Sequence, residues 1–474
     1  MHRRPASPVV VIVCLSITVT MALLVLWQWA AANTTVAAEP TIVATVDPTV
    51  ALSTPVLSTR RAPGVLSRDL NVSQFRADIQ PLMVAVEPTS CAAVSVDGVL
   101  VSEANGTTPV IPASNMKLVV AAVALEALGP SYTFTTSAVG QVGPDGVVAG
   151  DLVLLGGGDP VLSTDWWPAS GVQTYPPFGV TRLEQLAEQV QAAGVTRVDG
   201  SVVGDGTRYD DEFFNPTWDT DLHGVEGGPL DALLVNDGWM TSTITDVTAD
   251  PALGAAQVFT GLLRDRGITV GQGATAGTAG FDTVITSVTS LPLSNILGEM
   301  LETSDDNTAE MLVKEIGLVV SGVGTTSAGL AVATERLLAW GVPMDGVGFT
   351  DGSGLSRGNR ITCAALLAVL QHGDLADAVG EGLPIATTTG TLVGEFAGTE
   401  VEGTLRAKTG SLSGVKALSG YQPAAGGSVV EFALVLNQPG INLDGAYRPI
   451  WNELLAPALV TYPSAATPDQ LAPR

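Results

Sequence analysis

A serine and a lysine three residues apart could supply a nucleophile and its base. Ser114 precedes Lys117, and residues 118–128 are almost wholly apolar. If residues 114–128 form a helix, positions i and i+3 share a face, so Ser114 Oγ and Lys117 Nζ can meet. The free N–H groups of a first helical turn favour a developing anion, and burial favours the neutral amine that can accept a proton. The plainer alternative is a capping serine beside a lysine whose stem covers apolar surface.

The same four-residue pattern occurs twice. Ser413 precedes Lys416 at the same spacing, but among glycines beside a predicted strand. A strand does not place residues i and i+3 on one face. We therefore expect chemistry at Ser114 and Lys117 and none at the second copy.

A second polar group lies at the end of a predicted strand. It consists of consecutive residues that precede a predicted hairpin over 417–436: Lys408, Thr409, Gly410 and Ser411. Lysine and threonine side chains can bind a substrate carboxylate, and glycine lets a substrate backbone approach. By itself the segment could also be a simple turn.

A third polar group lies between helices predicted at 292–301 and 308–320. Its hydroxyl, Ser304, is followed by Asp306 and Asn307. Such side chains could cap the second helix. They could also relay a proton to a leaving amine, because a hydroxyl beside a polar neighbour can donate and accept.

The order of these three groups is more specific than any one of them. A Ser-x-x-Lys, then a serine-containing loop, then a Lys-Thr-Gly is the order in penicillin-recognising serine acyltransferases. Over roughly residues 70–455 the chain resembles the D-alanyl-D-alanine carboxypeptidases of the class C low-molecular-mass penicillin-binding proteins. Four segments carry the resemblance: 111–117, 150–160, 351–357 and 407–412.

The resemblance implies a substrate and a role for each residue. The substrate would be a peptidoglycan stem peptide ending in D-Ala-D-Ala, with β-lactams as inhibitors. Ser114 would attack with Lys117 as base, and the N–H groups of Ser114 and Ser411 would hold the oxyanion. Lys408 and Thr409 would bind the terminal carboxylate. Arg357 matches a family position near the stem-peptide side chain.

The second motif departs from the family pattern. The family usually has Ser-x-Asn, whereas an ungapped match places Asp306 at the asparagine position and Asn307 one residue later. Either Asp306 or a shifted Asn307 would then help Ser304 to protonate the leaving D-Ala. A β-lactamase and a catalytically inactive wall-binding homologue are alternative readings, and carboxypeptidase and endopeptidase activity are not distinguished.

Composition excludes some partners. The 474 residues include 47 Asp and Glu against 21 Lys and Arg, a formal net charge of −26. Nucleic-acid binding needs a basic surface, so it is not expected. The three histidines, His2, His223 and His372, lack the spacing of metal ligands. We expect neither a metal nor a cofactor.

The N-terminus predicts the compartment. Residues 8–32 form a nearly uncharged apolar run behind His2-Arg3-Arg4, long enough to span a bilayer with the N-terminus inside. An uncleaved membrane anchor over 1–32 and an extracytoplasmic enzyme are favoured over secretion after signal cleavage. In an oxidising compartment Cys91 and Cys363 could pair, or could be two small buried residues.

The element order predicts an α+β fold with an insertion. A hairpin over 91–102 and the helix over 114–128 are followed by short glycine-bounded strands, a helix at 183–193 and a strand at 197–203. Helices and a β-hairpin then return. We predict an antiparallel-sheet peptidase domain over 68–135 and 290–462, interrupted by an α/β module over 136–289. An anchor over 1–32 and a linker over 33–67 precede it, and a disordered tail over 463–474 follows it.

Overall fold

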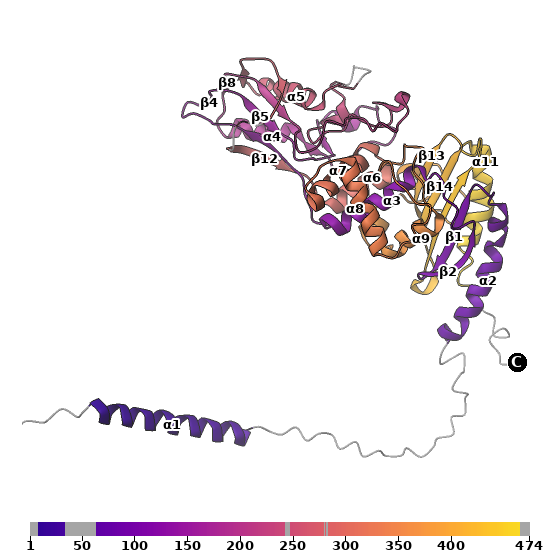
Figure 1. Cartoon of the computed structure of the whole chain (residues 1–474), viewed down its shortest axis with the longest axis horizontal. Coiled ribbons are helices and arrows are strands. Elements are labelled where there is room, and N and C mark those ends of the chain that lie inside the picture. The colour runs from indigo at the N-terminus through magenta and orange to yellow at the C-terminus, as the bar shows by residue number, and fades with distance from the viewer. Residues whose placement is uncertain (1–7, 34–62, 242–246, 279, 281–282, 465–474) are drawn as a thin grey trace, which may run out of the picture. The chain divides into compact units, whose positions relative to one another are not determined.

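The computed structural model describes residues 8–33, 63–241, 247–278, 280 and 283–464 (Figure 1). The chain divides into two compact units, Met1–Pro63 and Gly64–Arg474. In the first unit, α1 (Pro8–Asn33) is a continuous helix. Across the described residues, no one helix has both the length and the apolar composition to cross a bilayer. Among the described residues, one bent pair satisfies both criteria when its helices are taken together: α7 (Asp306–Ser321) and α8 (Thr326–Ala339), which meet at a 74° bend.

A five-stranded antiparallel sheet organises the second unit, with strand order β13-β14-β15-β1-β2. The predicted N-terminal hairpin is present, with Asp97 and Gly98 in its turn. Because β1 pairs with β15, early and late segments of the second unit are joined within the sheet. The strands run over Cys91–Val96 (β1), Val99–Ala104 (β2), Arg406–Leu412 (β13), Val415–Pro423 (β14) and Val429–Asn437 (β15).

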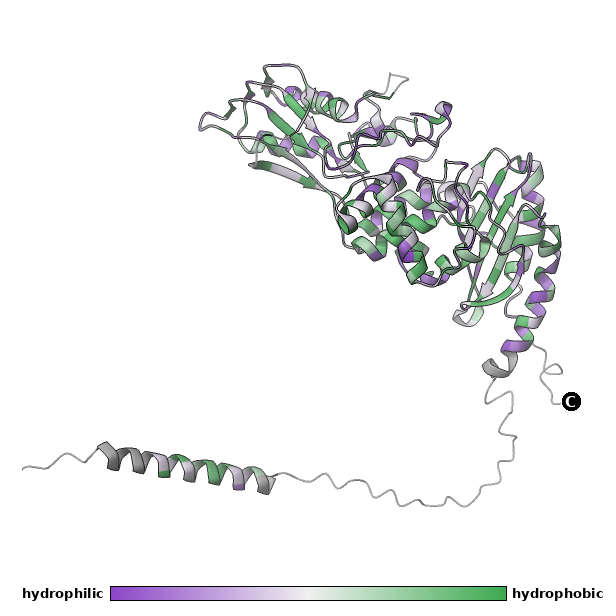
Figure 2. Cartoon of the chain, in the orientation of Figure 1, coloured by the Kyte–Doolittle hydropathy of each residue, from purple (hydrophilic) through white to green (hydrophobic). Residues whose placement is uncertain are grey.

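Both faces of this sheet are buried. Alternate residues of a strand point to opposite faces, so Ala433 and Val435 join one core cluster while Phe432 and Leu434 join the other. This explains why the sequence of β15 is a nearly continuous apolar run. Figure 2 shows apolar residues along these strands and in the helices that cover them.

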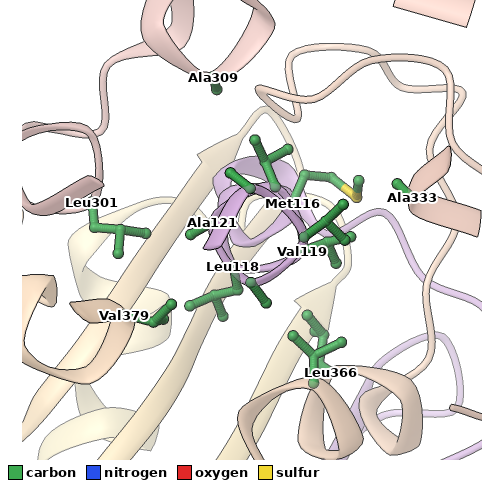
Figure 3. Packing of buried hydrophobic residues seen from close by; sticks show 14 of the residues in the cluster. Met116, Leu118, Val119, Ala121, Leu301, Ala309, Ala333, Leu366 and Val379 are labelled. Carbon is green, nitrogen blue, oxygen red and sulfur yellow. The ribbon is translucent and has the colours of Figure 1, made fainter. Parts of the chain in front are cut away.

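Helix α3 (Met116–Leu128) is buried at the centre of the first core. Figure 3 shows Met116, Leu118, Val119 and Ala121 surrounded by side chains of five other helices. The helix is apolar on all sides because every side faces protein. The surrounding helices are α6 (Leu293–Thr303), α7, α8, α9 (Cys363–His372) and α10 (Ala378–Gly382).

The opposite face of the sheet is covered by both ends of the unit. Helix α2 (Pro63–Ala85) buries Phe75, Ile79 and Leu82 there, at helical spacing. The prediction of a linker over 33–67 is therefore wrong for its last five residues, because Pro63 begins a helix that packs on the sheet. Residues 34–62 lie outside the described residues, as do 465–474 of the predicted tail. The C-terminal elements are α11 (Asp444–Pro449), a π-helix (Ile450–Leu455) and α12 (Ala456–Leu459).

Between α3 and α6 the chain builds a second layered part. Its mixed sheet has the order β11-β9-β5-β3-β12, and α4 (Leu183–Ala192) and α5 (Pro251–Asp265) cover it. The architecture is thus α+β with an inserted α/β module. The mixed-sheet strands are β3 (Thr135–Val139), β5 (Leu152–Leu155), β9 (Val202–Asp205), β11 (Thr275–Ala276) and β12 (Val284–Thr289). The predicted boundaries near 136 and 289 stay a prediction.

One predicted strand of the module is wrong. Residues 197–203 form two strands in different sheets, β8 (Arg197–Val198) and β9. The chain changes sheets at Gly200, whose N–H donates to Gly150 O. The remaining short elements are β4 (Val147–Val148), β6 (Leu162–Ser163), β7 (Thr181–Arg182), β10 (Thr269–Val270) and the 3₁₀ turns η1 (Ala113–Asn115), η2 (Trp167–Ala169), η3 (Thr220–Leu222), η4 (Asn236–Gly238), η5 (Gly390–Leu392) and η6 (Ala425–Gly427).

Candidate active site

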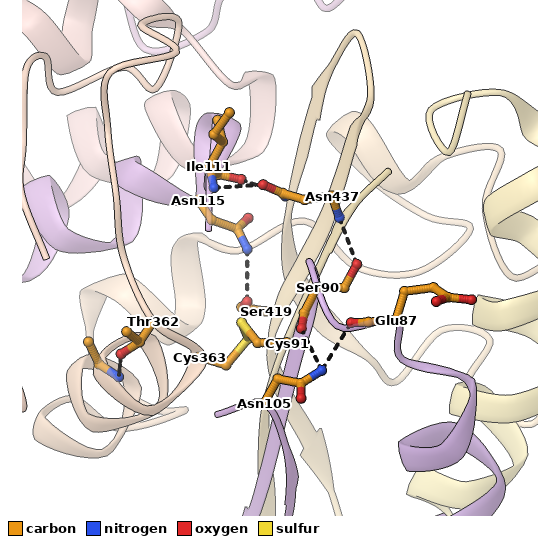
Figure 4. Close-up of a disulfide and its surroundings, with 11 residues drawn as sticks. Glu87, Ser90, Cys91, Asn105, Ile111, Asn115, Thr362, Cys363, Ser419 and Asn437 are labelled. Carbon is orange, nitrogen blue, oxygen red and sulfur yellow. Dashed lines mark hydrogen bonds between the residues drawn. A yellow bond between two sulfur atoms is a disulfide. The ribbon is translucent and has the colours of Figure 1, made fainter. Parts of the chain in front are cut away.

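Ser114 is held at the start of α3 by its neighbours. It lies in η1, half-buried, two residues before the first residue of α3. Asn115 Nδ2 donates to Ser419 Oγ on β14 at 2.8 Å, and Asn437 on β15 exchanges two hydrogen bonds with the backbone of Ile111 (Figure 4). The predicted helix thus begins as a 3₁₀ turn fixed to the sheet on both sides of the serine.

Two glycines let other segments approach this turn. A Cβ on Gly354 would lie 2.0 Å from Ala113 O, and the residue has a φ of +92°. A Cβ on Gly410 would lie 2.9 Å from Pro112 O. Larger residues at either position would collide with the backbone around Ser114. Both glycines belong to segments that carry the family resemblance. The close backbone approaches give a steric reason why each position is glycine.

Lys117 is fully buried and has three hydrogen-bond acceptors. Its Nζ lies 3.2 Å from Ser114 Oγ, 2.5 Å from Asp306 Oδ1 and 2.8 Å from the carbonyl oxygen of Ser353. An ammonium group has three donors, so the amine is fully satisfied in its charged form. The same 3.2 Å contact allows a neutral amine to accept the Ser114 proton.

The turn at residues 351–354 presents the Ser353 carbonyl to Lys117. Buried Asp351 accepts from the N–H groups of Gly354 and Ser356, at 2.9 and 2.6 Å. Glu310 Oε1 accepts from Ser353 N at 2.7 Å. Burial, together with the nearby Asp351 charge, raises the pKa of Glu310 to about 8. The inserted module completes this support, since Trp218 Nε1 donates to Asp351 Oδ2 at 2.8 Å.

The two candidate residues of the second motif, Asp306 and Asn307, make contacts in different places. Ser304 closes α6 with a φ of 69°, and Asp305 caps α7 by accepting from Thr308 N at 2.6 Å. Asp306 contacts Lys117, whereas Asn307 Oδ1 accepts from Gly228 N of the inserted module at 2.6 Å. Asp306 is therefore the residue that the fold brings to the Ser-x-x-Lys pair.

A carboxylate rather than an amide thus faces Lys117. Burial raises the pKa of Asp306 to about 6, and the Lys117 ammonium opposes that shift. Near neutral pH the group is mainly ionised and forms a short ion pair with the lysine.

Lys408 joins the third motif to the second. Its buried Nζ donates to Ser304 Oγ at 2.8 Å and to Thr409 O at 3.1 Å. Burial, followed by repulsion from Lys117, holds the pKa of Lys408 well below its usual range. Thr409 Oγ1 donates to Thr391 Oγ1 at 2.8 Å, which ties β13 to η5.

These groups open into one cavity of about 440 Å³. Ser114, Ser304, Asp306, Thr409 and exposed Ser411 all line it, as do Asn307 and Gly410. The opposite wall comes from the inserted module, through Gln173–Tyr175, Pro177, Leu222, Val225 and Glu226. The three predicted motifs therefore share one cleft, closed on one side by the insertion.

Arg357 does not line this cavity. It lies in a separate depression with Gly414 and Pro439, where its Nη1 donates to Ser413 O at 2.9 Å. A contact between Arg357 and a stem peptide stays a prediction.

The second Ser-x-x-Lys is not a pair in space. Ser413 is exposed in the β13–β14 turn, while Lys416 Nζ lies 4.1 Å from the ring centroid of Tyr447 and 5.1 Å from that of Trp451. The lysine makes a cation–π contact on the sheet face covered by the C-terminal helices.

Cys91 and Cys363 form a disulfide between β1 and the start of α9 (Figure 4). Their Cα atoms are 5.7 Å apart and 272 residues apart in sequence. The bond therefore links strand β1 to a helix that packs against α3. Among the residues with described side chains, no group of three His, Cys, Asp or Glu could hold a metal ion.

The sequence analysis missed three contributors to the site. The Ser353 carbonyl accepts from Lys117 directly, Glu310 accepts from the N–H of Ser353, and Trp218 donates to Asp351. The Asp-Gly-Ser-Gly segment signals a turn. Neither its contact with Lys117 nor the contact from Trp218, 133 residues away, has a local signal.

Comparison with known proteins agrees with this geometry. The profile of the D-Ala-D-Ala carboxypeptidase 3 (S13) family matches residues 92–250 and 241–448. A D-alanyl-D-alanine carboxypeptidase from an Actinomadura species is 31% identical over 77% of this chain and 81% of its own length.

Solved structures share the fold. Penicillin binding protein 4 from Haemophilus influenzae superposes with a TM-score of 0.65 at 21% identity, covering 80% of this chain and 99% of that one. A predatory peptidoglycan endopeptidase from Bdellovibrio bacteriovorus gives a TM-score of 0.52 at 17% identity, covering 78% and 90%. At these identities the likeness is one of fold.

Proposed function

This chain belongs to the D-Ala-D-Ala carboxypeptidase 3 (S13) family and is a serine-type carboxypeptidase, and we propose how its own residues act. The substrate is a peptidoglycan stem peptide that ends in D-Ala-D-Ala. Penicillins and other β-lactams, which present a reactive amide beside a carboxylate, acylate the same serine.

The reaction begins with Ser114. Lys117 takes the hydroxyl proton across the 3.2 Å contact, and Oγ attacks the carbonyl carbon of the penultimate D-Ala. The carbonyl oxygen becomes an oxyanion, which the backbone N–H groups of Ser114 and Ser411 stabilise. Both residues line the cleft.

The terminal D-Ala is bound on the side of Lys408 and Thr409. A carboxylate there meets the Thr409 hydroxyl and favours the charged form of the buried Lys408 beside it, whose pKa is otherwise lowered by burial and by Lys117. When the C–N bond breaks, the proton that Lys117 took from Ser114 passes to the leaving amine through Ser304 Oγ, which Lys408 Nζ holds at 2.8 Å, and Lys117 becomes neutral again. Free D-Ala departs and leaves an ester on Ser114.

Water completes the cycle. Lys117 is again the group positioned to take a proton, now from the water that attacks the ester carbonyl. The proton returns to Ser114 Oγ as the C–O bond breaks, so the enzyme is restored and a shortened peptide is released.

One observation carries this proposal: Lys117 Nζ contacts the nucleophile and the second motif at the same time. Fluorescent penicillin provides the first test. Covalent labelling followed by slow release supports the proposal, whereas rapid release indicates a β-lactamase and absence of labelling indicates an inactive homologue. Released D-Ala from purified muropeptides distinguishes carboxypeptidase from endopeptidase action, which frees a cross-linked strand instead.

The cellular setting is part of the proposal. The family acts on the cell wall, which places the enzyme outside the cytoplasm, and the apolar segment at 8–32 would tether it to the membrane. Residues 68–135 and 290–462 would form the peptidase domain and 136–289 the insertion. Sedimentation of the full chain with membranes, compared with a chain beginning at residue 63, tests the tether.

A further inference from the structure

Three carboxyl groups gather on one flank of the cleft, and one of them, Asp305, is close enough to Lys117 for the lysine charge to oppose the rise in its pKa that burial causes. Asp237 belongs to η4 of the inserted module, Glu299 to α6, and Asp305 to the loop after it. Glu299 and Asp305 line the cavity, as does Gln173, whose Nε2 donates to Asp237 Oδ2 at 3.0 Å. We call these three residues the carboxyl cluster.

Glu299 has an oxygen without a partner. The residue is only 1% exposed, its Oε1 accepts from Thr303 Oγ1 at 3.3 Å, and no described residue donates to Oε2. A buried carboxylate oxygen without a donor is costly, so such groups usually mark a missing ligand or a bound proton.

Repulsion within the cluster adds to this cost. Burial, and then the charges of Asp305 and Asp237, raise the pKa of Glu299 well above its usual range. Burial, and then the charge of Asp305, raise the pKa of Asp237 to about 8. Within the described residues, no lysine, arginine or histidine forms an ion pair with any member of the cluster. With a pKa of about 8, Asp237 is mainly protonated at neutral pH, so a cation entering the cluster would displace a proton and form an ion pair with the carboxylate that is left.

The cluster lies on the leaving-group side of the cleft. The end of α6 packs against η5, where a Cβ on Gly390 would lie 2.1 Å from Glu302 O. In η5, Thr391 accepts a hydrogen bond from Thr409, the residue proposed to bind the terminal carboxylate. Two further carboxyl groups line the cavity outside the cluster, Asp306 of the second motif and Glu226 of the inserted module.

We propose that the carboxyl cluster is a subsite for an ammonium group on the side chain of the leaving residue. The inference rests on the proposed function, because it takes its orientation from the carboxylate site at Thr409. A leaving residue that carries a cationic side chain, such as a diamino acid, would be preferred over a neutral residue of equal size. Terminal D-Ala, which has no such group, would leave the subsite unfilled.

Paired substrates test the preference. N-acylated D-Ala dipeptides ending in D-Ala, D-lysine or D-norleucine differ only in the leaving residue, and D-norleucine matches the length of lysine without its charge. For the native enzyme we expect kcat/KM for D-lysine to exceed that for D-norleucine about tenfold, the effect of one charge-assisted hydrogen bond. Equal values for the two substrates would overturn the inference.

Variants locate the effect. Glu299→Gln should reduce the D-lysine to D-norleucine ratio towards one, whereas Glu226→Gln, a carboxylate of the same cavity outside the cluster, should keep the native ratio. If Glu299→Gln does not fold, Asp237→Asn and Asp305→Asn give the same readout, and asparagine at 305 can still cap α7. A ratio retained in all cluster variants would exclude the subsite.

Penicillin acylation separates this inference from the proposed function. A native enzyme that is acylated and cleaves D-Ala-D-Ala but shows no preference for D-lysine contradicts only the subsite. A native enzyme that neither binds penicillin covalently nor cleaves any of the three dipeptides contradicts the proposed function itself.

Discussion

Ser114–Lys117 and Ser413–Lys416 have the same residue types at the same spacing, yet their surroundings differ completely. The first pair lies at the start of α3, and its lysine is fully buried with Ser114 Oγ at 3.2 Å. The second lies in a hairpin, with Ser413 exposed in the turn and Lys416 over the ring of Tyr447.

The difference follows from backbone periodicity. On a helix, residues i and i+3 are neighbours, whereas on a strand an odd separation places them on opposite faces. The buried position lets the first lysine take part in the reaction, because its contacts are a nucleophile, a carboxylate and a carbonyl. The second lysine lies over two aromatic rings, which stabilise its positive charge. The faces of these rings carry no nucleophile that the lysine could deprotonate.

The largest expected effect separates the two serines. Ser114→Ala should lower penicillin acylation and D-Ala release by about a thousandfold or more, because the nucleophilic oxygen is lost. The Ser413→Ala variant should be acylated by penicillin at the native rate. Labelling of Ser114→Ala at the native level, with loss in Ser413→Ala, would reverse the assignment.

The two lysines give the next comparison. Lys117→Ala should reduce the acylation rate about a thousandfold, since it removes the only basic side chain in contact with Ser114 among the described residues. Lys416→Ala should keep the native acylation rate and lose about 1 kcal/mol of unfolding free energy with its cation–π contact. Urea unfolding and acylation rates, measured on the same samples, decide between a catalytic and a structural loss.

Asp306 sharpens the comparison, because only the first lysine faces a carboxylate. Above about pH 6 the carboxylate is ionised and favours the charged lysine, which cannot act as a base. In Asp306→Asn this attraction is absent, so the rising limb of the acylation rate should move about one unit towards lower pH.

Asn307 is the matched control for that change. Asn307→Ala removes the contact with Gly228 and should lower the acylation rate without moving the midpoint of its pH profile. Second-order acylation rates between about pH 6 and 10 test both variants. A midpoint that moves in Asn307→Ala and stays fixed in Asp306→Asn would make Asn307 the working residue.

The smallest expected effect on the acylation rate concerns the disulfide between Cys91 and Cys363. Replacing Cys91 and Cys363 by serine opens a 272-residue loop and should cost about 4 kcal/mol of unfolding free energy. Acylation at low temperature should fall far less than in Lys117→Ala, because neither cysteine contacts the cleft residues. Thermal melting beside acylation at 10 °C separates stability from catalysis.

Local sequence signals located most elements around the site. The Asp97-Gly98 hairpin, the apolar helix after Ser114 and the capped helix after Asp305 each have a short-range cause in turn chemistry or periodicity. The failures have causes that lie elsewhere in the chain. Helix α2 is stabilised by packing of Phe75 and Ile79 on a sheet that also contains strands from residues 406–437, and residues 197–203 are divided between two sheets at Gly200.

The sequence by itself determined the order of the three motifs and the helical spacing that pairs Ser114 with Lys117. Only the tertiary structure decided which of Asp306 and Asn307 meets Lys117, that the Ser353 carbonyl is its third acceptor, and that the inserted module forms one wall of the cleft. Helical spacing is a property of neighbouring residues, so it can be read from the chain. Contacts between residues more than a hundred positions apart depend on how sheets and helices pack, and no local pattern encodes that packing.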